Sequence, residues 1–281
     1  MDATPRHAAP EAFDDRPDPG APDAPAAHDA PEDPEGAAPA VTGRALAMTG
    51  EEGPVYGPVD VDVPGTGLTI LTGRGGSGRT ALALTLAGRM RPDSGELTVL
   101  GETGTRAIRR RVAIAGVEQV DLLDRDVRVR HVLAEHRAWT SRWWRRVPAP
   151  DEDYLAELAG ETFGPRSLPP LDAYVSQLTG ADRHLLRIAL ALHPADGAEI
   201  GLLVVDDLEQ IHEPGQRLAL LSRLLGIAER IPVAVTSAVA PPEEILPAIH
   251  VADLEITARH LDPAETGVDR RLLARLKEIR R

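Results

Sequence analysis

The chain has 281 residues, a net charge of −13 and no cysteine, which excludes disulfides, thiolate nucleophiles and cysteine-ligated zinc. Hydrophobic residues make up 42% of the chain and aromatic residues only 3%, so one large or two modest domains would have aliphatic cores. No protein-wide basic surface for nucleic acid is indicated, and no apolar run reaches the roughly 18 residues of a membrane-spanning helix. We therefore expect a cytoplasmic protein that binds no nucleic acid.

The first 43 residues differ in composition from the rest of the chain. They are mainly Ala, Pro, Asp and Glu, and their ten acidic and two basic residues leave a net charge of −5 for the remainder. Such a segment buries too little apolar surface to offset the entropy of ordering. We expect residues 1–43 to be a disordered acidic tail, unlike a secretory signal, with folded structure from about Arg44.

Strand and helix patterns alternate along the remaining chain. Five segments read as strands: residues 59–63, 68–73, 96–101, 201–207 and 231–237. Three regions read as helical: residues 80–90, 131–190 with proline interruptions, and 217–230. This alternation predicts an α/β fold with a mainly parallel sheet.

The end of the chain, residues 264–281, reads as an amphipathic helix. Leu272, Leu273, Leu276 and Ile279 fall on one helical face. Since such apolar stripes normally face a core, we expect this helix to pack against the domain rather than to bind a membrane.

A glycine-rich loop separates the strand at 68–73 from the helix that follows it. Its residues are Gly73, Arg74, Gly75, Gly76, Ser77, Gly78, Arg79 and Thr80. They match the phosphate-loop pattern G-x-x-x-x-G-K-[ST] except that arginine replaces lysine. Glycines let backbone N–H groups converge on phosphate oxygens, and the helix dipole favours the same anion. The Thr80 hydroxyl is placed to bind Mg²⁺. The guanidinium of Arg79 is broader than the ammonium of lysine, so we expect the replacement to impair ATP hydrolysis more than nucleotide binding.

The stretch from this loop through "RPDSGELTVLGE" resembles the ATP-binding cassette (ABC) ATPases, the nucleotide-binding subunits of ABC transporters. The resemblance covers about residues 44–258. It implies a P-loop NTPase core at 44–263, with a helical signature subdomain at about 125–192. It also implies ATP and Mg²⁺ as cofactors, a homo- or hetero-dimer through the nucleotide sites, and a membrane permease as partner at the inner face of the cell membrane.

Two segments, one before the helical subdomain and one within it, carry part of this resemblance. Gln119, after "RRRVAIAGVE", stands where the family's glutamine reaches Mg²⁺ and the attacking water. The segment "LTGADRHLLRIALAL" resembles the family signature L-S-G-G-Q. There Leu178, Thr179 and Gly180 would close over the nucleotide of the opposite subunit. Asp182 replaces the family's glutamine and would weaken that contact if its carboxylate turned toward the phosphate.

The strand "LLVVDD" and the strand "VAVTS" carry the rest of the resemblance. By analogy with the family, Asp206 would bind Mg²⁺ together with Thr80 and Gln119, and Asp207 stands in place of the catalytic glutamate. Ser237 stands in place of the switch histidine, which leaves a hydroxyl where the family has an imidazole. The loop at Glu213 would contact the dimer partner.

Three further features depart from the family pattern or leave a choice open. Ala81 replaces a hydroxyl residue that supports the α-phosphate, and Tyr56 is the nearest candidate for the aromatic that stacks on adenine. The segment 137–146, "RAWTSRWWRR", holds all three tryptophans. It is either a surface for the permease or the membrane, or a helix that packs its tryptophans inward.

Two functions follow from these motifs. The first is an ATP-binding subunit that hydrolyses Mg-ATP, if slowly, to drive a permease. The second is a catalytically inactive relative with a regulatory or structural role, favoured by the substitutions at Arg79, Ala81, Asp207 and Ser237. Another P-loop enzyme, such as a small-molecule kinase, leaves the signature-like helix unexplained.

Overall fold

The computed structural model describes residues 38–118, 120–141, 144, 146–241 and 250–253, without the side chains of the last four. Most of the predicted acidic tail lies outside these residues, as do Gln119 and the predicted helix at 264–281. The expectations for those segments stay predictions.

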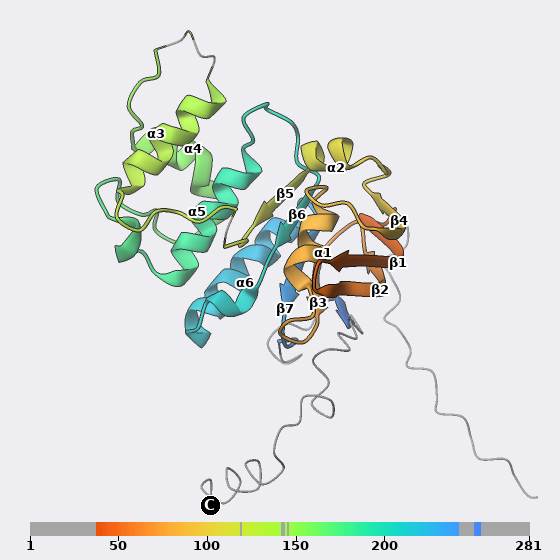
Figure 1. Ribbon diagram of the computed structural model, residues 1–281. Helices are drawn as coiled ribbons and strands as arrows, with labels where there is room; N and C mark the ends of the chain where they lie inside the picture. The colour runs from red at the N-terminus through yellow and green to blue at the C-terminus, as the bar shows by residue number, and fades with distance from the viewer. Residues whose placement is uncertain (1–37, 119, 142–143, 145, 242–249, 254–281) are drawn as a thin grey trace, which may run out of the picture. The chain divides into compact units, whose positions relative to one another are not determined.

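A parallel sheet of five strands forms the centre of the domain. Its order is β5-β6-β7-β3-β8, and every neighbouring pair is parallel. The strands are β3 (Leu68–Thr72), β5 (Val112–Ala115), β6 (Leu202–Val205), β7 (Val233–Ser237) and β8 (His250–Asp253). Every residue of β3, β5, β6 and β7 is buried, which explains their continuous apolar sequences. The predicted parallel α/β core is confirmed (Figure 1).

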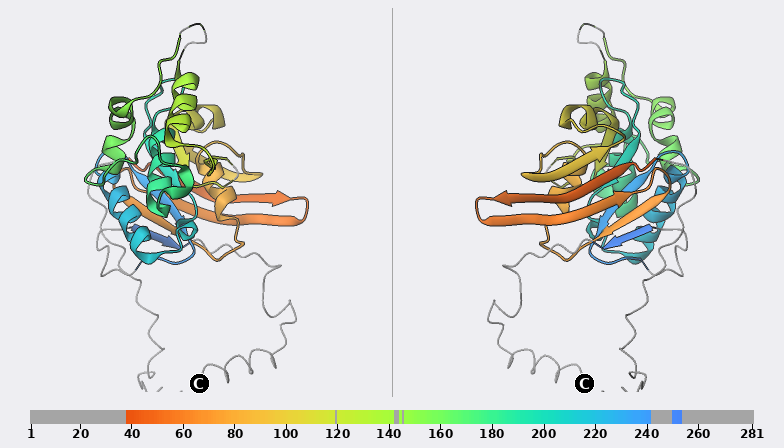
Figure 2. Two further views of the ribbon diagram at one scale, coloured as in Figure 1. Left: turned by 90° about the vertical axis from the view of Figure 1, so that its left-hand side faces the viewer. Right: turned by 90° about the vertical axis from the view of Figure 1, so that its right-hand side faces the viewer.

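A smaller antiparallel sheet has the order β2-β1-β4 (Figure 2). It consists of β1 (Val41–Gly50), β2 (Gly53–Val63) and β4 (Ser94–Val99). The expected start of folded structure at Arg44 was too late. Val41 is buried and pairs with both Val63 and Val99, so residues 41–43 belong to a strand and not to the tail.

Six α-helices connect and cover the strands in the described part of the chain. They are α1 (Arg79–Leu86), α2 (Thr105–Arg111), α3 (Val129–Thr140), α4 (Glu152–Phe163), α5 (Gly180–Leu192) and α6 (Pro214–Ala228). The mostly helical region expected at 131–190 is confirmed by α3, α4 and α5. The first helix was expected to reach Met90 but ends at Leu86. Gly88 then adopts a left-handed φ of 64°, where an added Cβ would lie 2.5 Å from the Thr105 carbonyl oxygen.

The two faces of the parallel sheet bury different hydrophobic cores. One core joins Ile70, Val205 and Val235 to residues of α3–α6, including Phe163 and Leu185. The other joins the alternate strand positions to α1, α2 and the antiparallel sheet. Because the strands are parallel, the polar groups at the carboxyl ends of β3, β6 and β7 meet at one edge of the sheet.

Candidate functional site

The glycine-rich loop folds back on itself between β3 and α1. The Gly73 amide donates to the Ser237 carbonyl at 3.1 Å, and the Ser77 amide donates to the Arg74 carbonyl at 3.1 Å. Gly76 and Gly78 have φ values of 76° and 78°. A Cβ on Gly78 would lie 2.2 Å from the Val55 carbonyl oxygen, so only glycine fits there without displacement.

The residues at the start of α1 fit a phosphate. Gly78 caps the helix without a side-chain hydrogen bond, and the first turn holds no acid. The N-terminal amides are therefore not capped by a carboxylate, and the helix dipole there favours an anion. Ser77 is 2% exposed, and its hydroxyl has no hydrogen-bond partner among the described residues. Thr80, the predicted Mg²⁺ ligand, is exposed.

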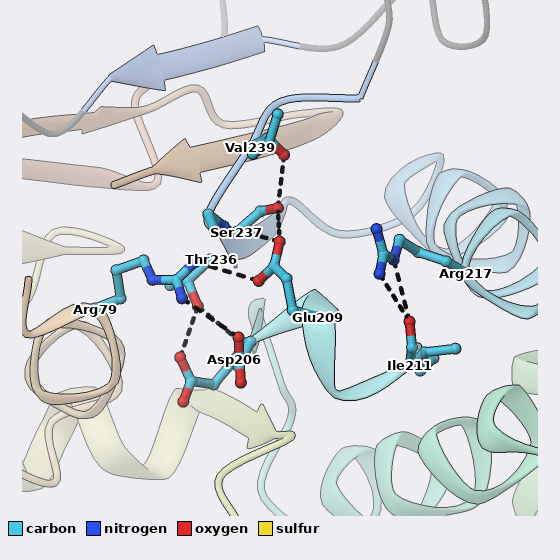
Figure 3. Close-up of polar contacts among 10 residues, drawn as sticks. Arg79, Asp206, Glu209, Ile211, Arg217, Thr236, Ser237 and Val239 are labelled. Carbon is cyan, nitrogen blue, oxygen red and sulfur yellow. Dashed lines mark hydrogen bonds and ion pairs between the residues drawn. The ribbon is translucent and has the colours of Figure 1, made fainter. Parts of the chain in front are cut away.

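Arg79 extends from this helix start toward two acids that follow β6 (Figure 3). Its Nη1 lies 3.2 Å from a Glu209 oxygen and its Nη2 lies 3.5 Å from an Asp207 oxygen. The Arg79 side chain is only 13% exposed. The cation at the phosphate loop is thus paired within the protein.

Asp206 lies at the end of β6 and is 2% exposed. The Thr236 hydroxyl donates to its Oδ1 at 2.6 Å and accepts from the Asp207 amide at 2.9 Å. The strand that carries Asp206 does not adjoin the loop strand. Instead β7 lies between β3 and β6, and Thr236 of β7 fixes the carboxylate through this hydrogen bond.

Asp207 has an unusual backbone and an unusual acidity. Its φ of 50° lies in the left-handed region, which few non-glycine residues adopt. Burial raises the pKa of Asp207 to about 6, and a hydrogen bond with Glu209 adds to this rise while Arg79 opposes it. Burial alone would also raise the pKa of Glu209, but hydrogen bonds from Ser237, Asp207 and the Ala238 amide outweigh it and lower that pKa.

Ser237 and Glu209 connect the end of β7 to this cluster. The Ser237 hydroxyl lies 2.6 Å from Glu209 Oε1 and 2.7 Å from the Val239 carbonyl, and can donate to either. The Ala238 amide donates to Glu209 Oε1 at 2.8 Å. Ser237 was predicted as a site residue, but Glu209 was not. The sequence does show a third acid two positions after Asp207. The short helix at Leu208–Gln210 contains this residue, whose carboxylate contacts Arg79 of the loop.

The signature-like segment forms a capped helix start. Thr179 is the N-cap of α5, and its hydroxyl accepts from the Asp182 amide at 3.1 Å. The Asp182 carboxylate is paired with Arg166 at 2.7 Å and accepts from Thr179. Its charge is therefore engaged within the subunit. The described side-chain hydrogen bonds of Leu178, Thr179 and Gly180 lie within this segment, to Arg183, Asp182 and His184.

The segment around Gln119 is tied to α5 and to the end of β6. Arg187, 6% exposed, donates to both carboxylate oxygens of Asp121, with Nε at 2.8 Å from Oδ2. Asp121 also accepts from the Gly116 amide at 2.9 Å. Gln210 accepts from Arg187 and donates to the Gly116 carbonyl. Gln119 itself lies outside the described residues.

Two expectations about aromatic side chains are corrected by burial. Tyr56 is 2% exposed and shares a hydrogen bond of 2.8 Å with Thr85, so it belongs to the core and offers no open ring for adenine. Trp139 and Trp144 are 73% and 62% exposed. The inward-packing interpretation is wrong for both.

Within the described residues, no cluster of three or more acidic, histidine or cysteine side chains is arranged to hold a metal ion. Of the predicted Mg²⁺ ligands, the structure describes the buried carboxylate of Asp206 and the exposed hydroxyl of Thr80. Mg²⁺ commonly binds through one or two protein oxygens, with water and substrate phosphate completing the shell. The residues present fit that mode. None of the helices in the described part of the chain has the length and apolarity that a bilayer crossing requires.

Comparison with known proteins agrees with this geometry. The sequence profile of the ABC transporter family matches residues 56–200. A cytochrome c biogenesis ATP-binding export protein of Xanthomonas campestris is 37% identical over 75 residues, which cover 27% of this chain and 35% of that protein. A molybdenum import ATP-binding protein of Paramagnetospirillum magneticum is 26% identical over 190 residues, 65% of this chain and 48% of that protein. The chain thus spans about a third to a half of the length of these curated relatives.

Solved structures are similar in fold. A nucleotide-free ATP-binding cassette from an ABC transporter superposes with a TM-score of 0.57 at 15% identity, covering 78% of this chain and 90% of that chain. The protein cbiO1 from Clostridium perfringens, part of an ABC transporter complex, gives a TM-score of 0.56 at 14% identity, covering 77% and 86%. The predicted cassette fold is confirmed.

Proposed function

Because this chain belongs to the ABC transporter family, we propose that it is the ATP-binding subunit that energises a separate membrane permease. The observation that carries this proposal is the wrapped loop at residues 73–80 beside the acids that follow β6. Arg79 touches Asp207 and Glu209, and β7 joins both elements. A phosphate chain on the loop would therefore lie next to carboxylates suited to a metal and a water.

The roles of individual residues follow from their chemistry. The backbone amides of Gly75–Gly78 and the guanidinium of Arg79 would bind the β- and γ-phosphates. Thr80 and Asp206 would hold Mg²⁺ together with Gln119, and the ion supplies positive charge that stabilises the transferring phosphoryl group. Asp207 would orient the attacking water, and Ser237 would fix the end of β7. Leu178, Thr179 and Gly180 would close the site of a dimer partner.

The second function stays open beside the first. Asp207 is one methylene shorter than glutamate, and an attacking water displaced by about 1 Å reacts roughly 100-fold more slowly. Its pKa of about 6 leaves it largely ionised at neutral pH, which favours a working base. The shorter reach favours slow hydrolysis or none. A nucleotide-binding subunit with a regulatory role is therefore the alternative.

The exposed tryptophans support a permease contact. Trp139 ends α3, and Trp144 follows in the next connection. Both expose large apolar surfaces on the helical part of the domain, and tryptophan is enriched at protein interfaces. We propose that this surface contacts the permease, with the protein at the cytoplasmic face of the membrane.

Purified protein provides the test. We expect Mg-ATP to bind with measurable affinity by calorimetry. Steady-state phosphate release should be slow but above that of a Gly78→Arg variant, whose added side chain meets the Val55 carbonyl and so blocks folding of the loop into its phosphate-binding shape. Asp207→Glu should raise turnover because it restores the longer reach. Tight binding with turnover equal to the blocked variant would favour the regulatory alternative, and absence of binding would contradict both.

A further inference from the structure

Glu209 is the acid that the family resemblance leaves without a role, yet its carboxylate has the most partners in the site. Oε1 accepts from the Ser237 hydroxyl at 2.6 Å and from the Ala238 amide at 2.8 Å. Oε2 accepts from Arg79 at 3.2 Å. Its side chain is 30% exposed. One oxygen is thus attached to the end of β7, and the other is directed to the cation of the phosphate loop (Figure 3).

This arrangement places the carboxylate of Glu209 at a position beside Arg79 that a phosphate of a bound nucleotide would also occupy. Of the two arginines in the loop, Arg74 is exposed, whereas Arg79 is mostly buried against Asp207 and Glu209. Of the two contacts the one to Glu209 is shorter. The Glu209 carboxylate also accepts from Ser237 at the end of β7, whereas Asp207 is joined to β7 through its backbone amide. A phosphate that recruits Arg79 must therefore compete with Glu209.

We propose that Glu209 is an internal counter-anion that competes with nucleotide phosphate for Arg79 and so sets the nucleotide affinity of this subunit. The inference deepens the proposed function, on which it rests. When Glu209 holds Arg79, the loop binds phosphate without that guanidinium. Apparent affinity then falls in proportion to the fraction of molecules in which Arg79 is released.

The test compares three variants by calorimetry, with the Mg²⁺ complex of a non-hydrolysable ATP analogue as ligand. Glu209→Gln removes the charge and should tighten binding about tenfold. This is the effect expected when the fraction of molecules with Arg79 released rises from about one in ten to nearly all. Glu209→Asp keeps the charge but shortens the side chain, so it cannot reach β7 and Arg79 at once. It should tighten binding by at least about threefold on the same reasoning. Glu229→Gln, an exposed acid at the end of α6, is the matched control and should bind as the wild type does.

The outcomes separate this inference from the proposed function. Wild type that binds, with Glu209→Gln equal or weaker, overturns the counter-anion and leaves the ATP-binding function intact. Wild type that fails to bind while Glu209→Gln binds supports the counter-anion and contradicts ATP binding by the natural chain. No binding by either overturns both. Tightening by Glu209→Gln with Glu209→Asp unchanged shows a plain charge effect and overturns competition through the Arg79 contact. Loss of packing alone would weaken binding, so tightening is not a structural by-product.

Discussion

Two of the arginine–carboxylate clusters in this domain, those of Arg187 and Arg79, differ in burial and in geometry. Arg187 is 6% exposed and donates hydrogen bonds to both carboxylate oxygens of a single acid, Asp121. Arg79 is divided between two acids, at 3.2 and 3.5 Å, whose side chains are 30% and 34% exposed. A bidentate, buried pair fixes geometry, whereas longer contacts on a shared cation are easily exchanged. The first cluster therefore has the properties of a structural tie, and the second those of a site that yields its cation to a ligand.

The positions of the clusters agree with this division. The Arg187 cluster joins α5 to the segment after β5 and to Gln210 after β6. It thereby connects the helical part of the domain to the strand edge that carries Asp206. The Arg79 cluster lies at that same edge beside the loop amides. Arg79 is thus the arginine placed beside the loop amides, and Arg187 is the one that connects parts of the fold.

The largest effect is expected where the buried tie is broken. Arg187→Met leaves the Asp121 carboxylate, whose side chain is 21% exposed, without its counter-charge. It should lower the free energy of unfolding by about 3 kcal/mol, the low end of the cost of breaking a buried pair. Urea denaturation measures this change. Replacing both partners, Arg187→Met with Asp121→Leu, should recover part of the loss. A cost below about 1 kcal/mol would place the pair among ordinary surface ion pairs and remove the contrast between the clusters.

An intermediate effect is expected in the loop that presents Arg79. Gly78→Ala places a Cβ 2.2 Å from the Val55 carbonyl oxygen at a φ of 78°, which should cost about 2 kcal/mol of unfolding free energy. Gly75 is the matched control, since a Cβ there meets nothing within 4 Å. Gly75→Ala should stay within about 0.5 kcal/mol of the wild type. Equal thermal denaturation of the two variants would show that the loop is not folded as described.

Much of this site could be predicted from local sequence. The glycine pattern fixes the loop between β3 and α1, and an apolar run that ends in two acids marks β6 and Asp206. Both signals lie within a few residues of chain, where backbone geometry and burial leave few alternatives. The parallel sheet followed from the alternation of strand and helix patterns for the same reason.

The contacts between distant segments could not be predicted. Arg187 and Asp121 are 66 positions apart, and Arg79 and Glu209 are 130 apart. Their pairing depends on strand order, and the position of β7 between β3 and β6 is not written in any local pattern. The burial of Tyr56 could not be predicted either, because its neighbours in the sequence are the same whether its ring faces solvent or Thr85. The role of Glu209 in the site therefore follows from the pairing of β6 with β7, which brings Glu209 next to Ser237.

The smallest effect on stability is expected at Arg79, and its dependence on pH has a defined sign. The acids beside Arg79 are about a third exposed, so Arg79→Met should cost only about 1 kcal/mol or less. The pKa of Asp207 is about 6, above that of an unfolded aspartate. Ionising it therefore destabilises the folded state as pH rises. Arg79 opposes that penalty, so the variant should lose more stability at pH 8 than at pH 5, which urea denaturation at the two values measures. A loss that is larger at pH 5, or one as large as that of Arg187→Met, would mean that both clusters serve the fold and that neither cation is available to a ligand.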